Sequence, residues 1–236
     1  ETKLSSQSKQ PSFPGYNFVR KDRLAGRGGG LAILVHHSVS FVHVDTSAFT
    51  NLNPTLELLA IRIEIGGSSL EIFNVYIPPI SSCPSAYCPN FHALLDLLAH
   101  DALFFGDFNA HHPYWFSPRD PSDPRGDSLA SSLDSSMLCT LNMDSPTRLP
   151  YSNNPSSSPD VTIAPAHLLP SLTWSVQTSL NSDHLPITVS YMTDDPPPRL
   201  RRSFTNFKLA NWSGFIAESE DLISHLPPPT SCAKDV

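Results

Sequence analysis

Apolar runs separated by polar and proline-rich stretches divide most of the chain into short segments. The apolar runs are rich in β-branched residues, so they predict β-strands rather than long helices. Pro78 and Pro79 end one of these runs, because proline cannot donate to a β-ladder. The predicted strands cover residues 31–44, 56–65, 69–79, 102–108, 160–164, 172–178 and 185–192.

Two segments have helical spacing instead. The first is predicted over residues 90–100, where Asn90 can cap the helix and apolar residues recur at i, i+3, i+4 and i+7. The second is predicted around residues 126–137, with Leu129 and Leu133 facing inward. Strands mixed with helices indicate an α/β fold in which two sheets pack together with helices outside.

The proline run within residues 194–202 predicts a domain boundary, since consecutive prolines cannot continue a sheet. We therefore expect one domain over residues 1–193 and a linker with an amphipathic helix over residues 194–236. A basic cluster in the linker either contacts phosphates or is simply solvated, and it consists of Arg199, Arg201 and Arg202. The apolar positions of the helix are Trp212, Phe215, Ile216, Leu222, Ile223 and Leu226.

Composition narrows the class of protein. The 236 residues are 39% apolar and 16% charged, with 24 prolines, which indicates a folded, loop-rich chain. The net charge of −7 argues against a broad basic surface for nucleic acid but leaves room for a local basic rim. The four cysteines have no zinc-site spacing, so reduced thiols are expected. No apolar run reaches about 18 residues, so no membrane span is expected.

The motif GDFNAHH (106–112) carries the first candidate chemistry. A buried strand delivers Asp107 and Asn109 to its end, and the one-residue spacing points both side chains to the same face. A carboxylate that orients water and an amide that donates to phosphate oxygen suit phosphoryl chemistry. Asp and Asn also form ordinary turns, so this motif alone leaves both interpretations open. His111 and His112 either contact substrate or belong to a solvated turn, because two histidines make no metal set.

The second candidate is SDHLPI (182–187), directly before a predicted strand. Asp183 can supply a carboxylate to a metal, and His184 can transfer a proton or stabilise charge. A polar loop before a core strand is the alternative. Alone this motif is a weak signal, but the two motifs together, in this order and spacing, form a strong one.

In this order and spacing the chain resembles the endonuclease/exonuclease/phosphatase family, and in particular the endonuclease domains of non-LTR (jockey-like) retrotransposons. ETK (1–3) resembles the family's metal-binding motif, and NVYIPP (74–79) its tyrosine strand. The retrotransposon branch is indicated by LNMDSPTR (141–148), by HHPYW (111–115) and by the NFK…W…F pattern over 206–215.

The resemblance implies a role for each matching residue. Glu1 would be the main Mg²⁺ ligand (Mn²⁺ is the alternative ion), and Asp183 would support the metal region. Asp107 would orient or deprotonate the attacking water, and Asn109 would hold the scissile phosphate. His184 would stabilise the developing charge on that phosphate.

Three further sets of roles follow from the same resemblance. Asp160 would hold the imidazole of His184, and Tyr76 would hydrogen-bond the phosphate or the leaving group. The residues expected to contact DNA are Thr147, Arg148 and Ser182.

The family fold is a four-layer α-β-β-α sandwich of two mixed β-sheets flanked by helices. The resemblance places the family's first strand before Glu1, so we expect the chain to lack it and to be weak or inactive alone. The implied partners are DNA, element RNA and a reverse transcriptase domain of the same polyprotein, in the nucleus and without a membrane. Two alternatives remain open: an inactive or binding-only copy of the fold, and a phosphodiesterase of the family acting on lipid or sugar phosphates.

Overall fold

A computed structural model describes residues 2–5, 7–23, 28–65, 67–85, 87–97, 101–116, 122–150, 155–193 and 211–225. The chain divides into two compact units, Glu1–Pro198 and Arg199–Val236. The strands are β1 (Tyr16–Lys21), β2 (Leu31–His36), β3 (Phe41–Val44), β4 (Glu57–Ile65), β5 (Ser68–Tyr76), β6 (Ala102–Asp107), β7 (Leu138–Thr140), β8 (Asp160–Pro165), β9 (Leu172–Val176) and β10 (Ile187–Tyr191). The helices are α1 (Ser47–Leu52), α2 (Phe91–Leu95), α3 (Pro124–Asp134) and α4 (Trp212–Ser224), with 3-10 turns at Ile80–Ser82 and Ala166–Ser171.

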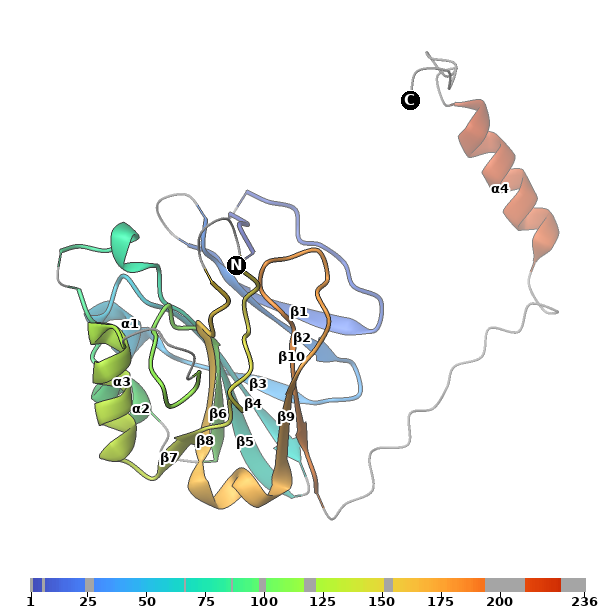
Figure 1. The fold of residues 1–236 in the computed structure, drawn as a ribbon. Coiled ribbons are helices and arrows are strands. Elements are labelled where there is room, and N and C mark those ends of the chain that lie inside the picture. The colour runs from blue at the N-terminus through green and yellow to red at the C-terminus, as the bar shows by residue number, and fades with distance from the viewer. Residues whose placement is uncertain are drawn as a thin grey trace. The chain divides into compact units, whose positions relative to one another are not determined.

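A six-stranded mixed sheet forms the centre of the first unit, in the order β3-β4-β5-β6-β8-β7. Strands β5 and β6 run parallel, and the other neighbours in this sheet are antiparallel. Figure 1 shows α1, α2 and α3 on one side of this sheet and two antiparallel ribbons, β1-β2 and β9-β10, on the other. The α/β class is therefore confirmed, with the second β-layer built from two separate ribbons in the described residues.

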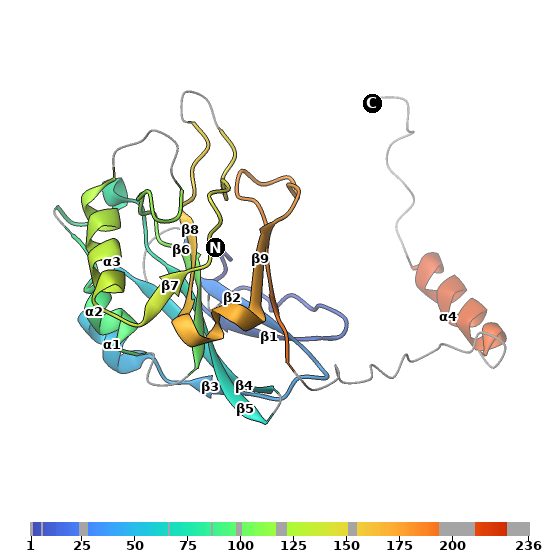
Figure 2. The same cartoon turned by 60° about the horizontal axis from the view of Figure 1, so that its bottom comes forward.

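The alternation of side chains along the strands explains these layers. In β4, Leu58 and Ala60 belong to the core under the helices, whereas Leu59 and Ile61 belong to the core under β1-β2. The third core lies under β9-β10 and contains Trp174, whose Nε1 donates to Oγ1 of Thr162 at 3.2 Å. The central sheet is thus buried on both faces, as Figure 2 also shows from a second direction.

Several predicted elements match the structure closely. The strands predicted at 56–65, 102–108 and 160–164 appear as β4, β6 and β8. Asn90 caps α2 by accepting from the backbone N–H of Ala93 at 3.1 Å, and Leu129 and Leu133 of α3 are buried as expected. Helix α2 ends earlier than predicted, at Leu95, and residues 98–100 lie outside the described part.

The single strand predicted over residues 31–44 is wrong. The structure divides it into β2 and β3, which belong to different sheets. The polar residues His37 and Ser38 interrupt the apolar run, and the N–H of Val39 donates to the carbonyl of His36 to close a turn. Strands β1 and β7 and helix α1 were not predicted, because their apolar residues are few and irregularly spaced.

The second unit contributes one described element. Helix α4 spans Trp212–Ser224 and begins at Asn211, whose side chain accepts from the N–H of Gly214 at 3.0 Å. No residue of α4 is buried, and its apolar positions from Trp212 to Ile223 are exposed. The basic cluster of residues 199–202, and Leu226, lie outside the described residues. No described helix has the length and hydropathy to cross a membrane.

Candidate active site

The ends of three neighbouring strands bring polar side chains together. Tyr76 ends β5 and is the register partner of Asp107, which ends β6. Asp107 is in turn the cross-strand partner of Asp160, which begins β8. Register partners project from the same face of a sheet, here the face that carries the two β-ribbons. The three side chains therefore form a row at one end of the sheet.

Gly106 allows the strands to come this close. A Cβ at this position would run into the backbone of Val75 on the neighbouring strand. A larger residue would push β6 away from β5 and would separate Asp107 from Tyr76. The glycine of the GDFN motif is thus explained by packing.

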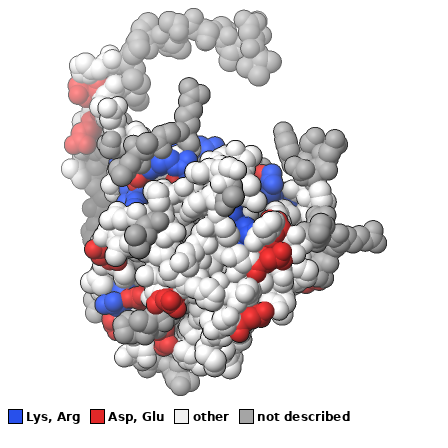
Figure 3. All heavy atoms as spheres, turned by 90° about the vertical axis from the view of Figure 1, so that its left-hand side faces the viewer, with Lys and Arg blue, Asp and Glu red and all other residues white. Residues whose placement is uncertain are grey.

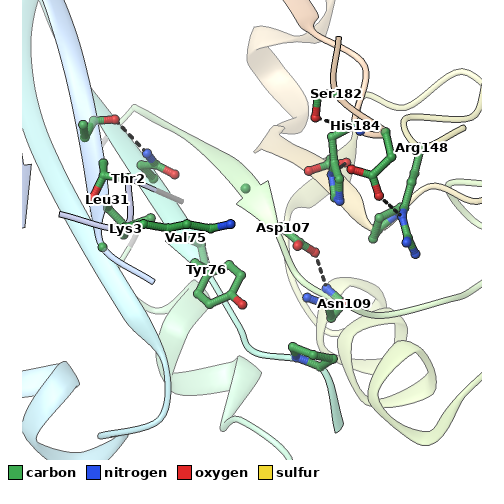
Figure 4. A pocket seen from close by; sticks show the side chains of 18 residues that line it. Thr2, Lys3, Leu31, Val75, Tyr76, Asp107, Asn109, Arg148, Ser182 and His184 are labelled. Atoms are coloured by element: carbon green, nitrogen blue, oxygen red, sulfur yellow. Dashed lines mark hydrogen bonds and ion pairs between the residues drawn. The ribbon is translucent and has the colours of Figure 1, made fainter. Parts of the chain in front are cut away.

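A cavity of about 850 Å³ opens at this end of the sheet. Figure 4 shows Tyr76, Asp107 and Asn109 along its floor, with Lys3 on one side and His184 on the other. The predicted site residues that line the cavity are Tyr76, Asp107, Asn109, Arg148, Asp160, Ser182, Asp183 and His184. Glu1 lies outside the described residues, although its neighbours Thr2 and Lys3 line the same cavity.

His184 and Asp160 form a hydrogen-bonded pair, as the sequence predicted. Nδ1 of His184 lies 2.8 Å from Oδ2 of Asp160. This hydrogen bond raises the pKa of His184, because it favours the protonated imidazole. With Nδ1 engaged, Nε2 is the ring nitrogen left for a ligand in the cavity.

Thr147 is placed differently from its predicted role at DNA. Its side chain is completely buried, and its hydroxyl donates to Oδ2 of Asp160 at 2.8 Å. The hydroxyl oxygen of Thr147, Oγ1, in turn accepts from the backbone N–H of Asp160 at 3.2 Å. Thr147 therefore holds Asp160 from behind, and the prediction of a direct DNA contact is corrected because no surface of this residue is available.

The surroundings of the Asp107 carboxyl disfavour its ionised form. Burial, followed by the nearby charge of Asp160, raises the pKa of Asp107 to about 7. Oδ1 of Asp107 accepts from the N–H of Asn109 at 2.9 Å, which opposes the shift without cancelling it. A carboxyl with this pKa can accept a proton near neutral pH.

Asn109 adopts an uncommon backbone conformation, with φ at +43°. Its side-chain Nδ2 donates to the carbonyl of Ile77 at 2.9 Å. One amide hydrogen is therefore used within the protein, and the other remains for a phosphate oxygen.

Two opposite charges lie at the rim. Nε of Arg148 donates to Oδ2 of Asp183 at 3.0 Å, and this bond lowers the pKa of Asp183. Arg148 nevertheless lines the cavity. His111 and His112 do not line it: the His111 backbone bonds to Asp123, and the His112 ring packs on Trp115.

The helix-covered side of the domain shows no comparable concentration of charge. Figure 3 displays this side with a largely uncharged face, scattered acidic groups and basic groups that gather along its upper edge. A polyanion would therefore find cationic partners at the rim, where Lys3 and Arg148 line the cavity.

Sequence reasoning missed three residues around the site. Lys3 stood in the quoted ETK motif but was given no role, and Asn74, in the tyrosine strand, donates to the carbonyl of Ala32 at 3.0 Å. The third is Arg125, which is buried next to the segments that follow β5 and β6. The sequence shows only that Arg125 precedes Gly126 at the start of a helix. An arginine at the surface could have the same neighbours, so its burial could not be predicted.

The chain is similar in sequence to several known proteins. Residues 70–188 match the endonuclease-reverse transcriptase family, Exo_endo_phos_2. The chain is 30% identical over 176 residues to the probable RNA-directed DNA polymerase from transposon BS of Drosophila melanogaster, covering 72% of this chain and 18% of the relative. It is 26% identical over 179 residues to the RNA-directed DNA polymerase from mobile element jockey of the same organism, covering 74% and 18%.

Among solved structures, the endonuclease domain of TRAS1, a telomere-specific non-LTR retrotransposon, has the same fold. The TM-score is 0.60 at 20% identity, over 78% of this chain and 83% of the TRAS1 domain. The chain thus spans less than a fifth of the two polymerases that it resembles, in contrast to most of the TRAS1 domain.

Proposed function

The chain belongs to the endonuclease-reverse transcriptase family, and from this membership we propose that its domain nicks DNA at retrotransposon target sites with the help of Mg²⁺. The observation that carries the proposal is the shared cavity of Asp107, Asn109 and the hydrogen-bonded pair of Asp160 and His184. Asp107 can act as the base, Asn109 as a hydrogen-bond donor to the phosphate, and protonated His184 as the cation that phosphodiester hydrolysis requires.

The nucleophile is a water molecule beside Asp107. The carboxylate orients this water and takes its proton, for which a pKa of about 7 is suited. The water oxygen forms a bond to phosphorus while the bond from phosphorus to the leaving sugar oxygen breaks, and that oxygen takes a proton from solvent. Asn109 donates its remaining amide hydrogen to the phosphate.

The charge that develops on phosphate is met by His184. Asp160 holds Nδ1 and raises the pKa of His184, which favours an imidazolium that can donate from Nε2. Tyr76 lines the same cavity and can hydrogen-bond the phosphate or the leaving oxygen. Acceptor and donor roles therefore fall on different side chains.

The donors in the cavity fit a hard cation. The described residues contain no group of three metal-ligating side chains, but Mg²⁺ binds through one or two carboxylates with water and substrate phosphate. Asp107 and Asp160 are cross-strand partners in this cavity, and a cation would offset their negative charge. Glu1 would be the main ligand with support from Asp183, and Mn²⁺ could replace Mg²⁺. When bound, the ion supplies neutralisation of phosphate charge.

The substrate and partners follow from the relatives. Two relatives are named as RNA-directed DNA polymerases, so we propose that this domain acts beside a reverse transcriptase domain of the same polyprotein, on nuclear DNA and in the presence of element RNA. Arg148 and Ser182 would contact the DNA near the cut, since both line the cavity. Residues 194–236 would lead toward the polymerase.

Nicking of supercoiled plasmid tests the proposal. The chain, and a version joined at Glu1 to the upstream strand of a relative, are incubated with Mg²⁺, with Mn²⁺ or with EDTA. We expect the extended version to convert supercoiled to open-circular DNA only with metal. Asp107→Ala and His184→Ala should each slow it by roughly 100-fold or more.

The pair of Asp101 and His167 supplies matched controls, because it forms a similar bond of 2.7 Å outside the cavity. Asp101→Ala and His167→Ala should nick as the parent does. Hydrolysis of an inositol phospholipid without nicking would favour the lipid-phosphate alternative. No hydrolysis by either version would support the inactive-copy alternative.

A further inference from the structure

The proposed chemistry leaves one buried cation without a role. Arg125, near the start of α3, is 1% exposed. The ion pairs found among the described residues do not include it, and its Nε has no hydrogen-bond partner. Burying a guanidinium costs free energy unless its donors are satisfied. The contacts that Arg125 makes therefore indicate which groups it holds in position.

The Nη1 group of Arg125 contacts backbone carbonyls from two segments, and its Nη2 donates to Sγ of Cys83 at 3.6 Å. Nη1 of Arg125 donates to the carbonyl oxygen of Pro78 at 2.9 Å. It also donates to the carbonyl oxygens of Phe108 at 3.3 Å and Asn109 at 3.1 Å. Pro78 follows β5, and the other two follow β6. One guanidinium therefore joins the segments that leave the strands of Tyr76 and Asp107.

The geometry of Asn109 depends on this junction. Its side chain donates to the carbonyl of Ile77, in the segment after β5, while its own carbonyl accepts from Arg125. Its backbone lies in the left-handed region, which a residue other than glycine enters at a cost and keeps only when its surroundings fix it. If the two segments moved apart, the amide would no longer be held beside Asp107.

The start of α3 is itself fixed to the loop after Asn109. The side chain of Asp123 accepts from the N–H of Gly126 at 2.6 Å and from the N–H of His111 at 3.1 Å. A Cβ on Gly126 would collide with the backbone of His111, so only glycine allows this approach. Arg125 is thereby held at a set depth beneath the site.

We propose that Arg125 is a positioning residue that acts through Asn109. It touches neither substrate nor the reacting atoms, and it holds the Asn109 amide in place for the phosphate. This inference deepens the proposed nicking activity and rests on it. A lysine cannot take over fully, because its side chain ends in one nitrogen, whereas Arg125 reaches the carbonyls through Nη1 and Sγ of Cys83 through Nη2.

The kinetic test is a double-mutant cycle on plasmid nicking with Mg²⁺. Arg125→Met should lower kcat by roughly 100-fold with little change in KM, because the misplaced amide serves the transition state. Arg125→Lys keeps the charge and the fold and should lower kcat less. In the Asn109→Ala background, Arg125→Met should lower kcat by a further factor of less than about 2, because the amide through which Arg125 acts is already gone. A full rate in Arg125→Met, or equal losses in both backgrounds, would overturn the proposal.

A second readout does not need activity. The N–H of Asn109 donates to Asp107, and the N–H of Ile77 donates to the carbonyl of Asp107. In Arg125→Lys, hydrogen exchange at both amides should accelerate relative to the N–H of Phe104, which reports the stability of β6. Exchange that rises equally at all three sites would mean a merely structural role. If neither the chain nor its extended version nicks, the proposed function falls, and this exchange pattern alone decides whether Arg125 positions Asn109.

Discussion

Asp107 and Asp160 are cross-strand partners at the end of the antiparallel pair β6-β8, and their carboxyl groups belong to the same cavity. Asp160 is supported by the hydroxyl of Thr147 and the imidazole of His184. Asp107 has the N–H of Asn109, and burial together with the charge of Asp160 raises its pKa to about 7. The ionised carboxylate of Asp107 therefore destabilises the folded state. Binding of a cation or a proton near this carboxylate would relieve that cost.

This arrangement predicts a pH-dependent stability cost. The unfolded chain ionises Asp107 near its ordinary pKa of 3.8, whereas the folded chain holds the proton to about pH 7. The metal-free protein should therefore lose stability as pH rises between these values and level off above the higher one. Asp107→Asn removes the ionisation, so it should be more stable than the parent near pH 8, by on the order of a few kcal/mol.

Urea unfolding in EDTA, at about pH 4 and about pH 8, measures this difference. The gain of Asp107→Asn over the parent should appear mainly at the higher pH. Asp96→Asn, at an exposed position after α2, serves as the control and should show the same difference at both values. An Asp107→Asn gain that does not change with pH would contradict the burial argument.

Thr147 should matter for stability and for the imidazole. Thr147→Val keeps the shape but removes the hydroxyl that bonds both the carboxylate and the N–H of Asp160. We expect a loss of about 1–3 kcal/mol in the free energy of unfolding, and slower nicking. Thr147→Ser keeps the hydroxyl and should retain the rate. Equal rates for the valine and serine variants would show that Asp160 holds His184 without this support.

The side chains of the two sequence motifs meet because of how their strands pair and pack. GDFN lies at the end of a buried apolar run, and Asp160 opens the neighbouring strand, so Asp107 and Asp160 meet once these strands pair. Ser182, Asp183 and His184 reach the same cavity because the β9-β10 ribbon packs over the sheet. The apolar runs predicted the strands themselves, whereas the meeting of the two motifs was predicted from their order and from the family resemblance.

Long-range backbone contacts set what the sequence did not reveal. Nothing local distinguishes a threonine behind a carboxylate from one at a surface, and Thr147 becomes buried only because its loop lies between Ser157 and Leu185. Arg125 is charged, and a charged residue is expected outside unless its partners are known. Its partners include carbonyls from two distant segments, which no spacing in the chain encodes.

Arg148 should contribute to DNA affinity through charge. It lines the cavity, so its guanidinium is available to a phosphate at the rim. Arg148→Ala should weaken binding similarly for all DNA sequences and reduce the slope of log affinity against log salt by about 1. Binding in EDTA at several salt concentrations measures this. Lys9→Ala removes one charge at an exposed position outside the cavity and should leave the slope unchanged.

The first unit should fold without the tail. Strand β10 ends at Tyr191, and the N–H of Met192 donates to the carbonyl of Ser171. A chain that stops at Thr193 should therefore keep its thermal midpoint to within about 2 °C. A chain that stops at Val176 loses β10, which packs against the core under the ribbon, and should unfold at a much lower temperature. A large drop in the thermal midpoint of the chain that stops at Thr193 would place the domain boundary after Thr193.

Asp183 offers a test that separates metal binding from structural support. Its carboxylate accepts from Arg148 and is half-exposed, so it can hold the arginine, a cation or both. If it supports the metal, Asp183→Asn should raise the Mg²⁺ concentration for half-maximal nicking by roughly 10-fold. The same change should strengthen metal-free DNA binding, because it removes a negative charge and releases Arg148 toward phosphate. Asp101→Asn removes one negative charge outside the cavity and should alter neither quantity. If Asp183 only holds the arginine, Asp183→Asn and Arg148→Ala should slow nicking to the same degree at every Mg²⁺ concentration, and the proposed metal role would fail.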